Sequence, residues 1–278
     1  MKYPIVLTIA GSDSSGGAGI QADIKAISAT GSYAASAITA VTIQNTLGVQ
    51  NVFPIPPEIV AGQIEAVLSD IGTDAIKIGM LHSTEVIMAI KHAIVSSLSN
   101  QPANIVLDPV MVSTSGHRLI EESAIGTLQT ELMPIARVIT PNIPEAEILT
   151  GTKITSKNDM AETAKRLSIN GQISVLMKAG HACGDDASDF FYNAEADTII
   201  ELPAKRCNTK NTHGTGCTIS SAFASYLAQG YSLNDAARLS KIYISKAIAA
   251  GADYEIGNGH GPVCHFFNLN ETFRAGLS

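Results

Sequence analysis

The sequence has few cysteines, no basic excess and no long apolar run, and each shortage excludes a class of protein. The four cysteines are Cys183, Cys207, Cys217 and Cys264. They form no C-x-x-C pair, which argues against both a zinc site and a disulfide framework and favours a reducing cytoplasm. The net charge of −7 argues against a nucleic-acid-binding protein, which normally carries a basic face. We therefore expect a protein that binds a small molecule.

Signals for secretion and membrane insertion are also missing. No apolar run approaches the ~18 residues that indicate a membrane-spanning helix. The N-terminus leads directly into the strand-like segment 3–10, without the charged region, apolar core and cleavage site of a signal peptide. We find no internal repeat, low-complexity tract or linker. These absences predict a single cytoplasmic domain over residues 1–278 that does not enter a membrane.

Short β-rich segments alternate with segments of helical spacing along most of the chain. Strands are expected at 3–10, 34–41, 49–55, 75–80, 104–111, 136–142 and 173–178, with a hairpin from 190–192 and 198–202. Helices are expected at 20–30, 56–71, 84–98, 123–132, 218–228 and 234–252. This alternation is typical of a parallel sheet that is covered by helices on both faces.

Residues 211–221, N-T-H-G-T-G-C-T-I-S-S, combine a glycine-rich turn with the start of a helix. Gly214 and Gly216 allow backbone N–H groups to converge on an anion, at the positive end of the helix dipole. Cys217 lies at the start of this helix, where the dipole is expected to lower the thiol pKa and favour a thiolate. The segment therefore fits phosphate binding with Cys217 as a base, although a plain turn with a buried cysteine fits it equally well.

A second glycine-rich loop, G-S-D-S-S-G-G-A-G at residues 11–19, follows the first strand. It lacks the G-K-[ST] of a Walker A motif and does not match the dinucleotide fingerprint G-x-G-x-x-G. Its position is the usual one for ligand sites, because these lie at the carboxyl ends of parallel strands. Both a binding loop and a plain turn remain open from this spacing alone.

Polar residues follow three further strands of the predicted sheet. Asp108 follows I-V-L, Asn142 and Glu145 follow V-I-T-P at a helix start, and Lys178 ends I-S-V-L-M-K. We expect these residues to gather on one rim of the sheet, where Asp108 and Glu145 could hold Mg²⁺ through its waters. The alternative is that each carboxylate only caps a helix or interacts with its dipole.

Several of these motifs together resemble the hydroxymethylpyrimidine/phosphomethylpyrimidine kinases of thiamin biosynthesis. The matching segments include L-T-I-A-G-S-D-S-S-G-G-A-G-I-Q-A-D-I-K, T-I-Q-N-T-L-G-V-Q, L-D-P-V-M, I-T-P-N-I-P-E-A and N-T-K-N-T-H-G-T-G-C-T-I-S-S, in the same order over nearly the whole chain. The resemblance implies the ribokinase-like fold, a three-layer α/β/α sandwich with a mostly parallel central sheet. It also implies ATP-dependent phosphorylation of 4-amino-5-hydroxymethyl-2-methylpyrimidine to its monophosphate and then to the pyrophosphate.

The resemblance assigns the phosphoryl-transfer residues. Gly214, Thr215, Gly216 and Cys217 correspond to the G-x-G-D motif of the superfamily, which supplies an anion nest and a base. The replacement of Asp by Cys is typical of this family. A thiolate could accept the proton of a primary alcohol, and Thr215 would contact the nucleotide phosphates.

The resemblance also assigns residues to the metal and the nucleotide. Asp108 and Glu145 would support Mg²⁺ and its waters, and Asn142 would help to place Glu145. Lys178 and Lys241 match positions near the phosphates or the nucleotide. The implied cofactors are therefore ATP and Mg²⁺.

For the pyrimidine, Gln44 is the residue whose chemistry fits best. A carboxamide offers a donor and an acceptor side by side, which complements an exocyclic amine beside a ring nitrogen. Asp23, Gly11 and Met80 match substrate-pocket positions by resemblance, together with the backbone at Val110. Core packing explains Met80 nearly as well.

Three other functions remain open at this point. A pyridoxal or pyridoxine kinase of the same superfamily shares the glycine-rich motifs, although Gln44 favours the pyrimidine. A hydrolase could use His213 and Cys217 as a base and a nucleophile, and a pyrimidine-binding protein would need no catalysis.

The apolar strands between residues 34 and 53 could form an edge for a homodimer.

Overall fold

A single mixed sheet organises the part of the chain that the computed structural model describes, which is residues 3–98, 104–112, 116, 119–180 and 185–269. Cys183 and His181 lie outside the described residues. The order of the strands in the sheet is β3-β2-β1-β4-β5-β6-β7-β8-β9. The strands are β1 (Ile5–Asp13), β2 (Tyr33–Asn45), β3 (Gly48–Pro54), β4 (Ala75–Ile78), β5 (Asn104–Leu107), β6 (Val138–Ile139), β7 (Ser174–Met177), β8 (Asp189–Asn193) and β9 (Thr198–Leu202).

Parallel pairing dominates the middle of the sheet. Strands β2, β1, β4, β5, β6 and β7 pair in parallel. At one edge β3 runs antiparallel to β2, and at the other β8 runs antiparallel to β7 and β9. The predicted parallel sheet and the predicted β8–β9 hairpin are therefore confirmed.

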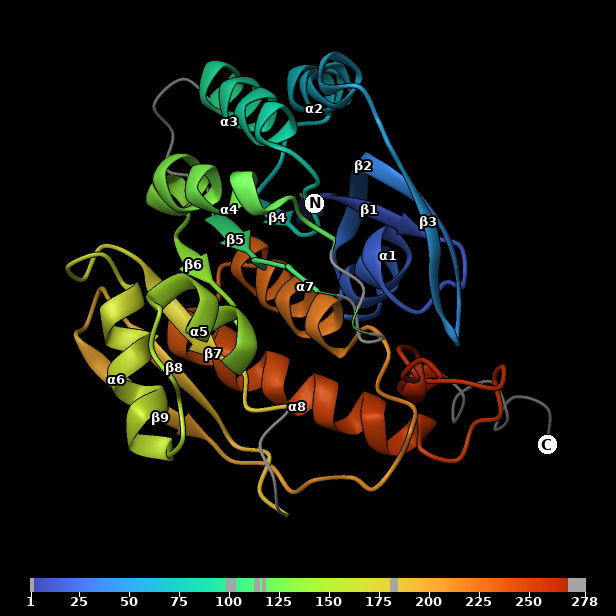
Figure 1. The fold of residues 1–278 in the computed structure, drawn as a ribbon, viewed down its shortest axis with the longest axis vertical. Helices are drawn as coiled ribbons and strands as arrows, with labels where there is room; N and C mark the ends of the chain where they lie inside the picture. Colours follow the sequence, from blue (N-terminus) through green and yellow to red (C-terminus); the bar gives the residue numbers. More distant parts are fainter. Residues whose placement is uncertain (1–2, 99–103, 113–115, 117–118, 181–184, 270–278) are drawn as a thin grey trace.

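Helices cover both faces of this sheet (Figure 1). The helices are α1 (Gly19–Ala29), α2 (Pro57–Asp70), α3 (Thr84–Leu98), α4 (Glu122–Thr127), α5 (Ile143–Thr150), α6 (Lys157–Leu167), α7 (Thr215–Ala228) and α8 (Leu233–Gly251). A π-helical turn (Leu128–Leu132) and a 3₁₀ turn (Met133–Ile135) follow α4. In the described ranges, no helix combines the length and the apolar character that crossing a membrane requires.

Two apolar cores show why the layers form. Successive strand side chains point to opposite faces of a sheet. Leu7 and Ile76 belong to the core that includes residues of α2, α3, α5 and α6, whereas Val6 and Ala75 belong to the core that includes residues of α1, α7 and α8. Both faces of the central strands are thus buried, as their continuous apolar runs predict. The predicted three-layer α/β/α sandwich is confirmed.

Helix α6 was not predicted from the sequence. It begins with a capping box, in which the Ser156 side chain accepts from the N–H of Asp159 and the Asp159 side chain accepts from the N–H of Ser156. The S-x-x-D pattern at 156–159 is a known start signal for a helix and could have identified it.

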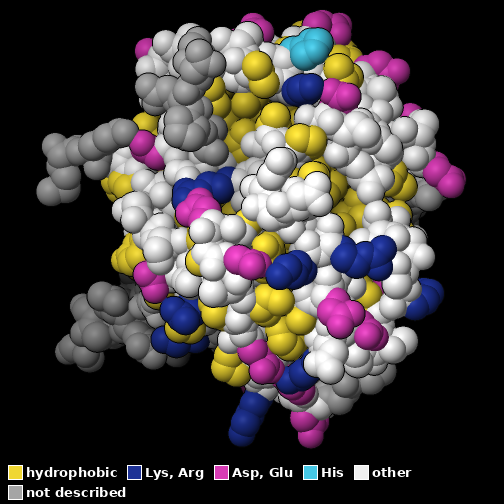
Figure 2. Space-filling view, turned by 90° about the vertical axis from the view of Figure 1, so that its left-hand side faces the viewer, with side chains coloured by type: hydrophobic (Ala, Val, Ile, Leu, Met, Phe, Trp, Pro, Cys, Tyr) yellow, Lys and Arg dark blue, Asp and Glu magenta, His cyan; other side chains and the backbone are white. Residues whose placement is uncertain are grey.

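Charged side chains of both signs are interspersed on the face of the molecule that Figure 2 shows. Exposed ion pairs bring such charges together, for example Lys153 with Glu147 at 2.6 Å and Lys157 with Glu201 at 2.6 Å. Exposed pairs of this kind contribute little to the free energy of unfolding.

Candidate functional site

A cavity of about 350 Å³ opens at the carboxyl ends of the parallel strands. Ligand pockets commonly have this size and position. Thirteen of the fourteen residues that the sequence analysis singled out line this cavity. They are Gly11, Gln44, Met80, Asp108, Val110, Asn142, Glu145, Lys178, Gly214, Thr215, Gly216, Cys217 and Lys241. The remaining residue, Asp23, lies elsewhere.

The two glycine-rich loops form one wall of the cavity through direct contact. Helix α7 starts at Thr215, and its cap residue Gly214 has a φ of 78°, which glycine adopts readily. A Cβ atom at Gly214 would overlap the carbonyl oxygen of Gly17. Since glycine brings no side chain to this cap, the N–H groups of the first turn of α7 can reach the cavity. This geometry fits an anion nest.

Cys217 is half-buried in the first turn of α7. Burial raises the pKa of its thiol to about 11, with further contributions from the Asp23 and Asp108 carboxylates. The charge of Lys77 and a backbone hydrogen bond from Gly19 act in the opposite direction but do not offset burial. The prediction that the helix dipole gives Cys217 a depressed pKa is therefore wrong, and the group is a thiol at neutral pH.

A cluster of opposite charges faces the cavity at the ends of β5 and β7. Lys178 Nζ lies 2.7 Å from Asp108 Oδ1 and 3.9 Å from Glu145 Oε2. Asp108 also accepts hydrogen bonds from Thr140 and, at 3.3 Å, from Ser220. Burial raises the pKa of Asp108, but the charges of Lys178 and Lys77 bring it below its usual value. Asp108 is therefore ionised at neutral pH.

Glu145 has a second function as part of a helix cap. Its carboxylate accepts from the N–H of Asn142 at 2.8 Å, and the Asn142 side chain accepts from the N–H of Glu145 at 2.9 Å. The capping alternative from the sequence thus applies to Glu145. Burial raises its pKa to about 7, helped by the Asp108 charge and opposed by Lys178. Two carboxylates that repel each other therefore share one lysine.

Asp23 does not reach the cavity wall, contrary to the sequence-based expectation. Its fully buried carboxylate lies 2.9 Å from Lys77 Nζ through both oxygens. It also accepts hydrogen bonds of 2.7 Å from Thr8 and from Ser221. Four donated hydrogen bonds saturate this carboxylate, which leaves it no capacity to hold a substrate.

Sequence reasoning missed Lys77. It lies inside the apolar strand β4 and is fully buried, which is rare for lysine unless an acidic partner compensates the charge. Burial lowers the pKa of Lys77, but the Asp23 charge raises it above its usual value. A lysine in an otherwise apolar, fully buried strand was the available signal, but the sequence did not identify its partner.

Lys241 approaches the cavity from α8 on the side of β8. Its Nζ donates to the Asp189 carboxylate at 2.7 Å and to the carbonyl oxygen of Ala187 at 2.7 Å. Apolar residues Ile244 and Ile248 of the same helix line the cavity beside it. Lys205 and Arg206 line the cavity as well, so this end of the cavity combines cationic side chains with an apolar wall.

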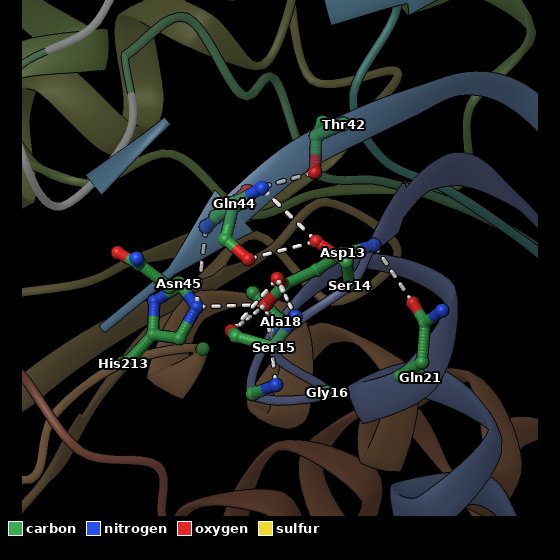
Figure 3. Close-up of polar contacts among 12 residues, drawn as sticks. Asp13, Ser14, Ser15, Gly16, Ala18, Gln21, Thr42, Gln44, Asn45 and His213 are labelled. Atoms are coloured by element: carbon green, nitrogen blue, oxygen red, sulfur yellow. Dashed lines mark hydrogen bonds and ion pairs between the residues drawn. The ribbon is translucent and has the colours of Figure 1, made fainter. Parts of the chain in front are cut away.

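Asp13, His213 and Gln44 form a polar cluster at the opposite end of the site (Figure 3). His213 Nε2 lies 2.8 Å from Asp13 Oδ2 and 3.3 Å from the amide nitrogen of Gln44. Asp13 lies within the G-S-D-S-S-G-G motif, and His213 directly precedes Gly214. The sequence analysis gave Asp13 no function and considered His213 only as a hydrolase base. Their positions within the two motifs were the available signal.

Comparisons with known proteins agree on one family. A family model described as phosphomethylpyrimidine kinase matches residues 13–264. A hydroxymethylpyrimidine/phosphomethylpyrimidine kinase of Rhizobium meliloti is 48% identical over 263 residues, which cover 94% of this chain and 97% of that protein.

Solved structures give the same result. A phosphomethylpyrimidine kinase from Clostridium difficile 630 is 45% identical, with a TM-score of 0.75 over 88% of this chain and 99% of the other. The ADP complex of Bacillus subtilis pyridoxal kinase has a TM-score of 0.86 at 34% identity, over 96% of this chain and 99% of the other. The fold is therefore ribokinase-like, and the resemblance that the sequence motifs carry is confirmed. The chain is a phosphotransferase that belongs to the phosphomethylpyrimidine kinase family.

Proposed function

We propose that this protein transfers the γ-phosphoryl group of ATP to 4-amino-5-hydroxymethyl-2-methylpyrimidine, and then phosphorylates the monophosphate to the pyrophosphate, in thiamin biosynthesis. The observation that carries the proposal is that the Gln44 carboxamide and the amide nest at Gly214 line the same cavity. The R. meliloti relative is named for both phosphorylations. The ADP complex of the B. subtilis relative supports a nucleotide as the second ligand.

We assign the pyrimidine and the nucleotide to opposite ends of the cavity. Gln44, Gly11, Met80 and Val110 would contact the pyrimidine. Lys178, Lys241, Asn142 and Thr215 would contact the nucleotide and its phosphates. In this arrangement the hydroxymethyl group meets the terminal phosphate beside Gly214, Gly216 and Cys217.

The proposed transfer forms one bond and breaks one bond. The alcohol oxygen attacks the γ-phosphorus, the bond from that phosphorus to the β–γ bridging oxygen breaks, and its electron pair leaves with ADP. The alcohol proton passes to solvent as the new bond forms, because Cys217 is a thiol at neutral pH and has no free site for it. Because phosphoryl transfer depends mostly on positioning and charge neutralisation, we assign the amide nest and Lys178 larger contributions than Cys217.

Asp108 and Glu145 fit a magnesium ion. No group of three or more His, Cys, Asp or Glu side chains in the described segments could hold a metal. A cation here would therefore take most of its ligands from water and phosphate, as Mg²⁺ does readily. A divalent ion would also relieve the repulsion that contributes to the raised pKa of Glu145. When bound, Mg²⁺ neutralises phosphate charge in the transition state.

The proposal is tested by comparing substrates. With ATP and Mg²⁺, we expect kcat/KM for hydroxymethylpyrimidine to exceed that for pyridoxine, and ADP to form in both successive steps. A strong preference for pyridoxine would favour the pyridoxal kinase alternative instead. Absence of ATP consumption with every pyrimidine alcohol would favour a binding protein.

The hydrolase alternative loses support because His213 is engaged elsewhere. Its Nε2 lies 2.8 Å from the Asp13 carboxylate. The variant Cys217→Asp separates the two chemistries: a kinase mechanism, in which Asp can take up the alcohol proton, predicts appreciable remaining kinase activity, whereas a covalent nucleophile predicts none.

We also propose a homodimer. The outer strand β3 and its neighbour β2 expose apolar side chains, with Ile43 57% exposed and Phe53 68% exposed. A second copy could bury this edge, which would otherwise favour aggregation. We expect sedimentation to give twice the chain mass, and the double variant Ile43→Glu, Phe53→Lys to give a monomer. A wild-type monomer at micromolar concentration would contradict the proposal.

The single-domain and cytoplasmic predictions remain proposals. A single sheet from β1 to β9 supports one domain for residues 1–278. Free thiols at Cys207, Cys217 and Cys264 support a reducing compartment. Limited proteolysis that leaves no stable fragment, and cell fractionation, would test the two proposals.

A further inference from the structure

The Asp13 carboxylate organises the first glycine-rich loop. It is buried and accepts hydrogen bonds from the N–H groups of Ser15, Gly17 and Ala18 at 2.8, 3.1 and 2.8 Å. Burial raises the pKa of Asp13, but hydrogen bonds from His213 and Ser15 and the charge of His213 lower it to about 2. Asp13 is therefore ionised at neutral pH and can only accept hydrogen bonds.

This acceptor determines the state of the His213 ring. An ionised carboxylate 2.8 Å from His213 Nε2 requires a hydrogen on that nitrogen. The ring is also held in position: a Cβ atom at Gly17 would overlap it, and the backbone N–H of His213 donates to Gly261 at 3.0 Å. The single hydrogen on Nε2 is donated to Asp13, so this nitrogen has no free lone pair and cannot accept a hydrogen bond from the Gln44 carboxamide 3.3 Å away (Figure 3).

Thr42 gives an independent constraint on the other end of the Gln44 carboxamide. Its Oγ1 lies 2.9 Å from the carbonyl oxygen of Ser12 and 3.1 Å from the side-chain amide of Gln44, and its single hydrogen can be donated to only one of them. Both contacts are hydrogen bonds only when Thr42 donates to Ser12 and accepts from the amide nitrogen of Gln44. The two contacts together require the carboxamide to be turned over from the arrangement drawn in Figure 3, with the amide oxygen toward His213 and the amide nitrogen toward Thr42.

We propose that Asp13 and His213 are specificity-determining positioning residues that fix which end of the Gln44 carboxamide donates and which accepts. This inference rests on the proposed function, in which Gln44 contacts the pyrimidine. In the fixed orientation, Oε1 accepts from an exocyclic amine and Nε2 donates to the neighbouring ring nitrogen. The substrate class selected is an aminopyrimidine. The corresponding oxo-pyrimidine presents an acceptor and a ring N–H in the same two places and is rejected.

The test compares the 4-amino substrate with its 4-oxo analogue in the wild type and in His213→Ala. We expect the wild type to favour the amine by about 10²-fold or more in kcat/KM, because mismatched buried hydrogen-bonding groups discriminate strongly. In His213→Ala the Gln44 carboxamide is free to rotate by 180° about its terminal bond. We expect the ratio of kcat/KM for the amine to that for the oxo analogue to fall to within about 10-fold. We expect Asp13→Ala to behave similarly.

The control variant is Asn45→Ala. Asn45 follows Gln44 on β2, but its side chain accepts from the N–H of Leu47 at 2.9 Å and does not line the cavity. We expect it to keep the wild-type ratio. A general loss of folding would lower both kcat/KM values together, whereas loss of positioning changes their ratio.

A measurement without turnover separates this inference from the proposed function. In ¹⁵N spectra of the imidazole groups, we expect His213 to carry its hydrogen on Nε2 at neutral pH. A ring protonated only on Nδ1, or an unchanged substrate ratio in an active His213→Ala, would overturn the inference. Failure of the wild type to phosphorylate any pyrimidine, with Nε2–H present, would overturn the proposed function and with it the substrate selection, but leave the Asp13–His213 geometry intact.

Discussion

Two lysine–carboxylate pairs lie at the rim of the same sheet but differ in what surrounds them. Lys77 and Asp23 are sealed beneath the site, and the carboxylate receives further hydrogen bonds from Thr8 and Ser221. Lys178 and Asp108 face the cavity, and Lys178 lies 3.9 Å from a second carboxylate, Glu145. All hydrogen-bonding positions of the carboxylate are thus occupied by protein groups in the first pair, whereas the second pair faces a cavity that a ligand can enter.

Both pairs consist of a lysine and an aspartate, so residue type does not distinguish a structural ion pair from a ligand-binding one. What distinguishes them is whether the pair is closed off from the cavity and whether protein groups already fill its hydrogen-bonding positions. The Lys77–Asp23 pair holds β4 and α1 against α7, because Asp23 lies on α1 and Ser221 on α7. The Lys178–Asp108 pair can exchange a protein partner for a phosphate or a metal ion. We therefore expect changes in the first pair to affect stability and changes in the second to affect activity.

The largest expected effect is on folding. Lys77→Ala leaves the Asp23 carboxylate buried without its cation, and we expect the free energy of unfolding in urea to fall by about 3–5 kcal/mol. The double variant Asp23→Leu, Lys77→Met removes both charges, and we expect it to recover much of that loss. If the free energy of unfolding of Lys77→Ala fell by less than about 1 kcal/mol, the assignment of a structural function to the Lys77–Asp23 pair would be wrong.

The next effect is on catalysis. We expect Lys178→Met to lower kcat/KM by about 10²–10³-fold, because a preorganised charge at the phosphates is lost. Its free energy of unfolding should fall less than that of Lys77→Ala, since Asp108 lines the cavity whereas Asp23 does not. Lys153→Met is the matched control, because Lys153 forms an exposed ion pair outside the cavity. An active Lys178→Met would contradict the assignment.

Glu145 gives a pH-dependent effect. Its pKa is raised from 4.5 to about 7 by burial, so the stabilisation from its protonated form is complete below about pH 4.5 and is lost as the pH rises through 7. We expect Glu145→Gln to lose less stability than the wild type between pH 5 and 8, by up to roughly 3 kcal/mol. Urea unfolding at several pH values measures this difference, and parallel curves would contradict it.

The same carboxyl group predicts proton release when Mg²⁺ binds. Below pH 7 the metal must displace the proton of Glu145, so we expect calorimetric titration at pH 6 to show an uptake of protons by the buffer. Glu145→Gln should bind Mg²⁺ without this release. Equal proton release in the two proteins would place the metal elsewhere.

The smallest expected effect is on the reactivity of the Cys217 thiol, whose pKa responds to charges from both lysine–carboxylate pairs. With a pKa of about 11, we expect the alkylation rate of Cys217 by iodoacetamide to be low at pH 7.5 and to rise about tenfold per pH unit toward pH 11. Lys77→Met should lower this rate further, because Lys77 favours the thiolate. Peptide mapping distinguishes Cys217 from Cys207, which is also half-buried. Rapid alkylation at pH 7.5 would contradict the raised pKa.

The sequence could predict the location of the site because the site lies at the carboxyl ends of the parallel strands, which the sequence pattern identifies. The glycine-rich loops and the residues after β5, β6 and β7 come together once the sheet is parallel, and this places Asp108, Lys178 and Gly214 in one cavity. The parallel sheet itself follows from alternating apolar segments. The strand pattern therefore carries most of the information about the location of the site.

The sequence could not predict which groups pair or how burial shifts them. Asp23 has Lys77 as its partner 54 positions away, and this choice depends on how α1 packs on β4. The Cys217 pKa depends on desolvation by segments far away in the chain, which outweighs the local helix dipole. Helix α6 was missed although its sequence marks it: behind the capping box, the buried residues Met160, Ala164 and Leu167 recur at helical spacing in an otherwise polar segment.

The close approach of Gly17 and Gly214 has a consequence for biosynthesis. The two loops are separated by nearly 200 positions, yet a methyl group at Gly214 would not fit between them. A growing polypeptide on the ribosome therefore cannot complete the cavity wall that the two loops form until the start of α7 has left the exit tunnel and docked. Translation intermediates should accordingly lack nucleotide affinity even when their N-terminal strands have already paired.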